Sequence, residues 1–93
     1  MSEEKGYFPK SVTIFGKEIK VEVTDNLDDD VLGEFRAQEK IIYLSDFAGK
    51  ETLLHEVAHA ALHYSGISEM LDEKLEEAIC TCMEYGLAQY IKL

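Results

Sequence analysis

The 93-residue sequence has one proline, no tryptophan, two cysteines and no long hydrophobic run. Its longest stretch without a charged residue is twelve residues, 57–68, which is too short to span a membrane. Basic residues are also scarce, because nine Lys and Arg stand against nineteen Asp and Glu, a formal net charge of −10. Binding of nucleic acid depends on phosphate neutralisation by Lys and Arg, so we expect neither nucleic acid nor an anionic membrane as a partner.

The two cysteines, Cys80 and Cys82, are two positions apart. On a helix this spacing points their side chains about 200° apart, so they cannot form a disulfide with each other. Residues 1–5 also lack the basic segment followed by an apolar one that is typical of a secretory signal peptide. We therefore expect a cytoplasmic protein with reduced thiols.

The length and the 46% hydrophobic fraction indicate a single globular domain, residues 1–93. Apolar residues alternate over residues 12–23 on both sides of Gly16, which predicts a hairpin. Residues 31–36 and Ile41–Leu44 predict a second pair of strands, so the strands should fill about residues 12–44.

Residues 49–64 change to a helical pattern, with apolar residues recurring at three and four positions and Gly66 as the stop signal. Ser68 is a good N-cap for a second helix over about residues 69–91. The sequence thus predicts an α+β fold, with a small, mostly antiparallel sheet packed against two helices.

The first predicted helix contains the segment HEVAH, in which His55 and His59 are one turn apart. Side chains at this spacing lie on one face, so both imidazoles can bind one zinc ion. Glu56 lies about 100° around the helix and can act as a general base on a metal-bound water. A shuffled sequence of this composition would contain the motif roughly once in a hundred cases, so a zinc site is the favoured interpretation.

A catalytic zinc needs a third protein ligand and an open fourth position. His63 lies roughly 12 Å along the axis from His55, too far to join the site on an unbroken helix. On the second predicted helix, Glu76 falls on the face of the apolar residues, which include Cys80, and it is our first choice of ligand. Other acidic residues of this helix remain open as the ligand, namely Glu77, Asp72 and Glu73. The same helical wheel places Glu77 and Glu84 on the solvated side, and makes Asp72 a candidate acceptor for the free N–H of a ligating histidine.

The segment TLLHEVAHA at 52–60, followed by Glu76-Glu77 and by Gly86-Leu87, resembles the gluzincin-type metallopeptidases, especially the small ImmA/IrrE-like and phage-borne zincin domains. The resemblance covers most of the chain from Ile41 onward. It implies a zincin-like minimal core in which His55, His59 and Glu76 or Glu77 bind zinc and Glu56 is the base. It also implies that the strand before the motif helix, Ile41–Leu44, lies along the substrate cleft.

The sequence therefore predicts a zinc metallopeptidase acting on protein or peptide substrates, with Glu56 activating water for attack on a peptide carbonyl. Tyr64 and His63 are candidates by position for stabilising the oxyanion. The alternative is a non-catalytic, zinc-stabilised protein-binding domain, because so small a core gains from a metal staple. Such a site usually has a fourth protein ligand, and the sequence offers no convincing one; Cys80, at the edge of the Glu76 face, is the residue to consider first.

Overall fold

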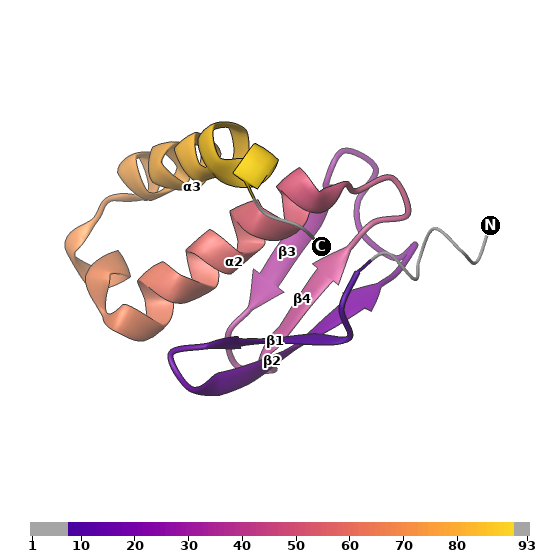
Figure 1. Ribbon diagram of the computed structural model, residues 1–93, viewed down its shortest axis with the longest axis horizontal. Coiled ribbons are helices and arrows are strands. Elements are labelled where there is room, and N and C mark those ends of the chain that lie inside the picture. The colour runs from indigo at the N-terminus through magenta and orange to yellow at the C-terminus, as the bar shows by residue number, and fades with distance from the viewer. Residues whose placement is uncertain (1–7, 91–93) are drawn as a thin grey trace.

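The computed structural model describes residues 8–90, which form one four-stranded sheet and two α-helices (Figure 1). The strands follow one another as β1 (Ser11–Ile14), β2 (Lys17–Val23), β3 (Gly33–Arg36) and β4 (Ile41–Leu44). The helices are α2 (Lys50–Ser65) and α3 (Glu73–Leu87), with short 3-10 helices at Ile67–Met70 and Ala88–Tyr90. The predicted α+β class, with strands in the N-terminal half and helices after them, is confirmed.

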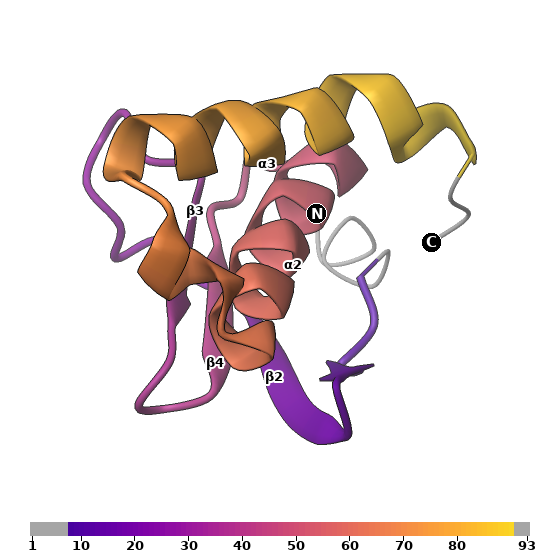
Figure 2. The ribbon, with the colours of Figure 1, turned by 90° about the vertical axis from the view of Figure 1, so that its left-hand side faces the viewer.

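The sheet has the order β1-β2-β4-β3, and two of its three strand pairs are antiparallel. The central pair, β2 with β4, is parallel, so the sheet is mixed but mostly antiparallel as expected. Its hydrophobic face is covered by α2, and α3 lies on the side of α2 away from the sheet (Figure 2). The core between sheet and helix consists of fully buried aliphatic side chains, among them Ile19, Ile42, Leu44 and Leu53.

The order of the strands places β3 at one edge of the sheet and β4 inside it. The expectation that Ile41–Leu44 lines a cleft is therefore wrong, because both edges of β4 are paired with other strands. A hydrogen bond from the Ser45 N–H to the Leu32 carbonyl (2.8 Å) fixes which residue pairs of β3 and β4 are hydrogen-bonded to each other and which are not. With this pairing the backbone groups of Gly33 and Phe35 point away from β4, toward the open edge.

The first helix ends as predicted, because Gly66 adopts a left-handed conformation (φ 86°) directly after Ser65. The second helix begins later than predicted. Ser68 lies inside the 3-10 helix, and Asp72 is the N-cap of α3, where its carboxylate accepts a hydrogen bond from the Leu75 N–H (2.7 Å). The extended backbone of Leu71 separates the two segments, so a helix could not continue from Ser68. Helix α3 ends at Leu87, and the predicted end near residue 91 lies outside the described residues. Within residues 8–90, no helix combines the length and the apolar character needed to cross a membrane.

Candidate metal centre

The two motif histidines lie on the side of α2 that faces α3, with ring centroids 5.0 Å apart. Their side chains are 13% and 23% exposed, so both are largely withdrawn from water. His59 contacts the first turn of α3 and His55 contacts a residue two turns further on, so the two helices run antiparallel. The four-residue spacing of the motif thus brings both imidazoles to one seam between helices.

Three carboxylates of α3 surround these two rings. Glu84 lies 2.8 Å from Nδ1 of His55, and Glu76 lies 2.8 Å from Nδ1 of His59. Glu77 spans the pair, with one oxygen 2.9 Å from Nε2 of His55 and the other 3.1 Å from Nε2 of His59. Carboxylates that hold the Nδ1–H of each ring leave both Nε2 lone pairs free for a metal, at the place where the Glu77 carboxylate lies.

The structure thus brings both Glu76 and Glu77 to the histidines, Glu76 at Nδ1 of His59 and Glu77 at the Nε2 atoms of both rings. Glu84 does not lie on the solvated side as the helical wheel predicted, because its side chain is 18% exposed and contacts His55. The wheel was centred on apolar residues near the end of the helix, of which Leu87 is 43% exposed. The side that meets α2 is the ridge of Glu76, Cys80 and Glu84, and their four-residue spacing was the signal that could have identified Glu84. Of the other candidates, Asp72 is the helix cap and Glu73 is exposed.

Glu56 lies one position around α2 from His55, on the side of the helix that faces the edge strand β3, and it lines the same hollow as the histidines. Its side chain is 8% exposed and accepts a hydrogen bond from the backbone N–H of Phe35. A Cβ at Gly33 would collide with Thr52 (2.8 Å) and crowd Glu56 (3.1 Å), so the missing Cβ of that glycine allows the strand to approach the helix. Burial raises the pKa of Glu56, and the nearby charges of the two histidines oppose the shift only in part. A carboxylate whose pKa is raised by burial accepts a proton more readily than an exposed one.

His59 and Glu76 shift each other's titration. Burial opposes protonation of His59, but its hydrogen bond with Glu76 and the charges of Glu56 and Glu77 outweigh burial and raise its pKa. The same hydrogen bond lowers the pKa of Glu76. A neighbouring hydroxyl, that of Ser68, also lowers the pKa of this carboxylate. Protons and a metal ion therefore compete for the same imidazole.

Cys80 completes a group that could hold a metal ion. Its Sγ and one ring nitrogen each of His55 and His59 lie within 4.8 Å of one another, and the cysteine is fully buried. Burial, together with the charges of Glu76 and Glu77, raises the pKa of the thiol to about 12. A coordinating metal removes such a proton outright. Our choice of glutamate as the third ligand gave Cys80 a lesser role than this geometry does.

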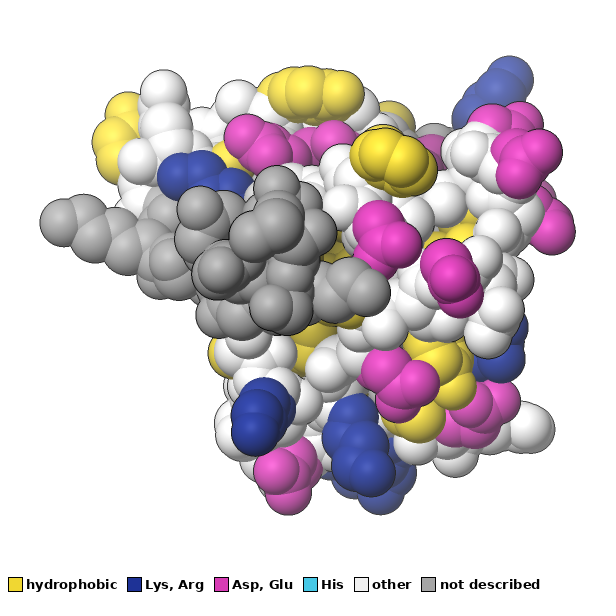
Figure 3. Space-filling model, turned by 90° about the vertical axis from the view of Figure 1, so that its right-hand side faces the viewer, with side chains coloured by type: hydrophobic (Ala, Val, Ile, Leu, Met, Phe, Trp, Pro, Cys, Tyr) yellow, Lys and Arg dark blue, Asp and Glu magenta, His cyan; other side chains and the backbone are white. Residues whose placement is uncertain are grey.

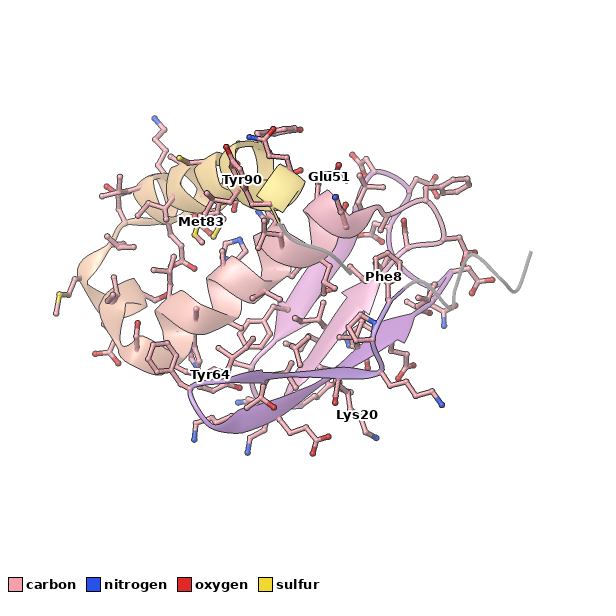
Figure 4. The ribbon with its side chains drawn as sticks, viewed as in Figure 1. Phe8, Lys20, Glu51, Tyr64, Met83 and Tyr90 are labelled. Carbon is pink, nitrogen blue, oxygen red and sulfur yellow. The ribbon has the colours of Figure 1, made fainter. Side chains whose placement is uncertain are left out.

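The two histidines, with Glu76 and Glu77, line a hollow of about 540 Å³, bordered by β3 on one side and by the start of α3 on the other. On the face drawn in Figure 3, no histidine is visible outside the part that the grey atoms cover. His63 lines the hollow at the far end of α2, where its ring packs on Phe35 (centroids 6.0 Å apart). The Tyr64 hydroxyl donates a hydrogen bond to the Ala37 carbonyl (3.4 Å), and its ring points toward the β1–β2 hairpin (Figure 4). Of the two residues considered for an oxyanion, His63 therefore lines the hollow, and Tyr64 points away from it.

Comparisons of the chain with protein-family models, with curated proteins and with solved structures find no significant match. What the protein does must therefore be argued from its own residues. The fold and the site together define a small α+β protein with a candidate metal centre between two antiparallel helices.

Proposed function

We propose that the protein is a zinc-dependent metallopeptidase. The observation that supports it most is the convergence of the Nε2 atoms of His55 and His59 on a single carboxylate, that of Glu77, at the border of an open hollow. Imidazole and carboxylate donors suit zinc, and the outer carboxylates Glu76 and Glu84 would fix the ring orientations.

The position of Glu76 bears on the third ligand. It was our first choice from the sequence, but it already meets Nδ1 of His59, the nitrogen opposite the one that Glu77 meets. Histidines that bind a metal through Nε2 would therefore have Glu77 as the nearest carboxylate ligand and Glu76 as a partner of the ring N–H. The geometry favours Glu77, the alternative that the sequence left open.

Glu56 is the general base of this proposal. When bound, zinc lowers the pKa of water toward 7 and polarises the substrate carbonyl. Glu56 would take the proton of the attacking water, and its pKa, raised by burial, strengthens it as a base. The Phe35 N–H, which donates to its carboxylate, keeps this side chain at the inner wall of the hollow.

The substrate would lie along β3. This edge strand borders the hollow, and the carbonyls of Gly33 and Phe35 point outward, as does the Gly33 N–H. An extended peptide can add to such an edge through main-chain hydrogen bonds, so we expect a protein or peptide substrate bound as a strand. A cytoplasmic location fits the two free cysteines, because thiols stay reduced there.

The experiment compares the zinc-loaded wild type with Glu56→Gln in a digest of a labelled peptide mixture. Loss of the base should lower the rate of hydrolysis by roughly 10² to 10⁴ and leave the zinc content unchanged. Glu51→Gln is the matched control, because Glu51 is an exposed residue in the first turn of the same helix. Hydrolysis that persists unchanged in Glu56→Gln would exclude this mechanism.

A second candidate function is a non-catalytic zinc domain that binds a partner protein. The observation in its favour is Cys80, which offers a fourth donor next to the two histidines and could close the coordination sphere. In that case zinc would raise the melting temperature, and the wild type would cleave no peptide in the same digest.

A further inference from the structure

The metal centre of the proposed function has two unequal donors on α3. We propose that Cys80 is a permanent ligand of this metal and that Glu77 is the ligand that gives way to water or substrate. The inference rests on the proposed metal centre and assigns the exchangeable position within it.

Each helix offers two donors beside the same pair of imidazoles. On α2 the donors are His55 and His59 themselves, four residues apart. On α3 they are Glu77, whose carboxylate meets both Nε2 atoms, and Cys80, three residues later, whose Sγ lies within 4.8 Å of one ring nitrogen of each histidine. Side chains at these spacings lie next to one another on one face of a helix. Two antiparallel helices with two donors each can therefore supply the four ligands of a tetrahedral ion.

The exposure of the two α3 donors is opposite. The Cys80 side chain is fully buried under the histidines, whereas Glu77 is 58% exposed and lines the hollow. Water cannot approach the thiolate, but it can replace a carboxylate that stands in solvent. When Glu77 swings out, three protein ligands remain and one position opens toward the hollow, which is the arrangement of a catalytic zinc site.

The chemistry of this exchange requires no oxidant or reductant. On metal binding, the S–H bond of Cys80 breaks, its proton passes to solvent and a metal–sulfur bond forms. Opening of the site then exchanges one metal–oxygen bond, that to Glu77, for another, that to water. A thiolate ligand also favours zinc over magnesium, calcium and manganese, which prefer oxygen ligands.

The test is the absorption spectrum of the full chain with cobalt in place of zinc. A thiolate ligand gives an intense near-ultraviolet charge-transfer band. We expect this band in the wild type and in Glu77→Gln, and its loss in Cys80→Ser. Cys82→Ser is the matched control, because Cys82 is an exposed thiol two residues away and its loss should leave the band unchanged.

Zinc affinity, measured by competition with a chromogenic chelator, gives a second readout. Cys80→Ser should weaken zinc affinity by about 10²-fold or more, because the loss of a ligand should cost at least as much as the loss of a residue that only orients a ligand. Glu77→Gln should weaken zinc affinity less. In the Cys82→Ser background, bound zinc should also slow alkylation of the single remaining thiol. This protection does not depend on whether a Cys80 variant folds.

A wild-type cobalt complex without the thiolate band would overturn the inference, and so would a band that disappears in Cys82→Ser. Hydrolysis of peptides by a centre without the band would leave the peptidase proposal standing and reject Cys80 as a ligand. The band in a protein that cleaves nothing would support the Cys80 assignment and count against the peptidase. Absence of cobalt and zinc binding would reject both.

Discussion

Replacing Gly33 by alanine perturbs the close approach between strand β3 and helix α2. The added Cβ would lie 2.8 Å from Cγ2 of Thr52 and 3.1 Å from Cγ of Glu56, whereas carbon atoms pack at about 3.5–4.0 Å. Both neighbours are at most 9% exposed, so neither can turn into solvent without disturbing the packing. Overpacking of this kind costs about 1–3 kcal/mol. In a domain of this size that corresponds to a decrease in melting temperature of roughly 4–24 °C.

Gly86→Ala is the control, with an expected effect of the opposite sign. Gly86 lies within α3, and a Cβ there would meet nothing within 4 Å. Alanine in place of a helical glycine should stabilise the protein by about 0.5–1 kcal/mol. Thermal melts followed by circular dichroism, with and without zinc, measure both variants. The reasoning is refuted if Gly33→Ala melts at or above the wild type, or if both variants shift the melting temperature in the same direction.

Four further predictions concern the metal centre and its residues. The protein purified from zinc-supplemented cells should contain about one zinc per chain by elemental analysis, and chelation should lower its melting temperature, since a ligand at 1,000 times its Kd stabilises by about 4.1 kcal/mol. The pKa of His59 is raised above 6.5, so protons should already compete with zinc for this imidazole at pH values somewhat above 6.5. Zinc affinity measured by titration should therefore fall as the pH is lowered toward 6.5 and below. In the metal-free protein, the His59–Glu76 pair should stabilise the fold most between pH 4.5 and 6.5, measured as the free energy of unfolding of the wild type minus that of Glu76→Gln. This difference should decrease in acid, where Glu76 is protonated, and above pH 6.5, where His59 loses its proton. Glu84→Gln should weaken zinc binding roughly 10- to 100-fold and exposed Glu73→Gln should not, and equal affinities for the two would show that Glu84 does not orient His55.

The positions of most elements could be predicted because each has a strong local signal. The period-two alternation identified the strands, and the spacing of three and four identified α2, whose end at Gly66 follows from a left-handed backbone that glycine adopts without strain. The two histidines and Glu56 likewise come from one continuous motif, whose spacing fixes their relative directions. Such features depend only on neighbours within a few residues.

What the sequence could not provide depends on contacts between distant segments. The order of the strands, with β3 at the edge and β4 inside, follows from a parallel pairing of β2 with β4 that no local pattern encodes. The side of α3 that meets α2 was also misjudged. A helical wheel can assign a partly buried acidic residue to the exposed side of a helix when its partner is not known. Glu84 was assigned in this way, but it is partly buried against His55. Ser68 was predicted as the N-cap of the second helix, but the extended backbone of Leu71 interrupts the chain after it, and Asp72 is the cap instead.

The location of every candidate metal donor within residues 55–80 has a consequence for the order of folding. These groups meet by closing one helical hairpin, whereas the central strands β2 and β4 pair across an intervening strand and two turns. The helical hairpin and the β2–β4 pair close chain segments of similar length, but each helix of the hairpin forms from contacts within a few residues, which is faster than pairing strands that are distant in sequence. An ion present during folding would therefore bind to the hairpin first and would accelerate assembly of the domain. Metal added to the completed fold would change the unfolding rate instead.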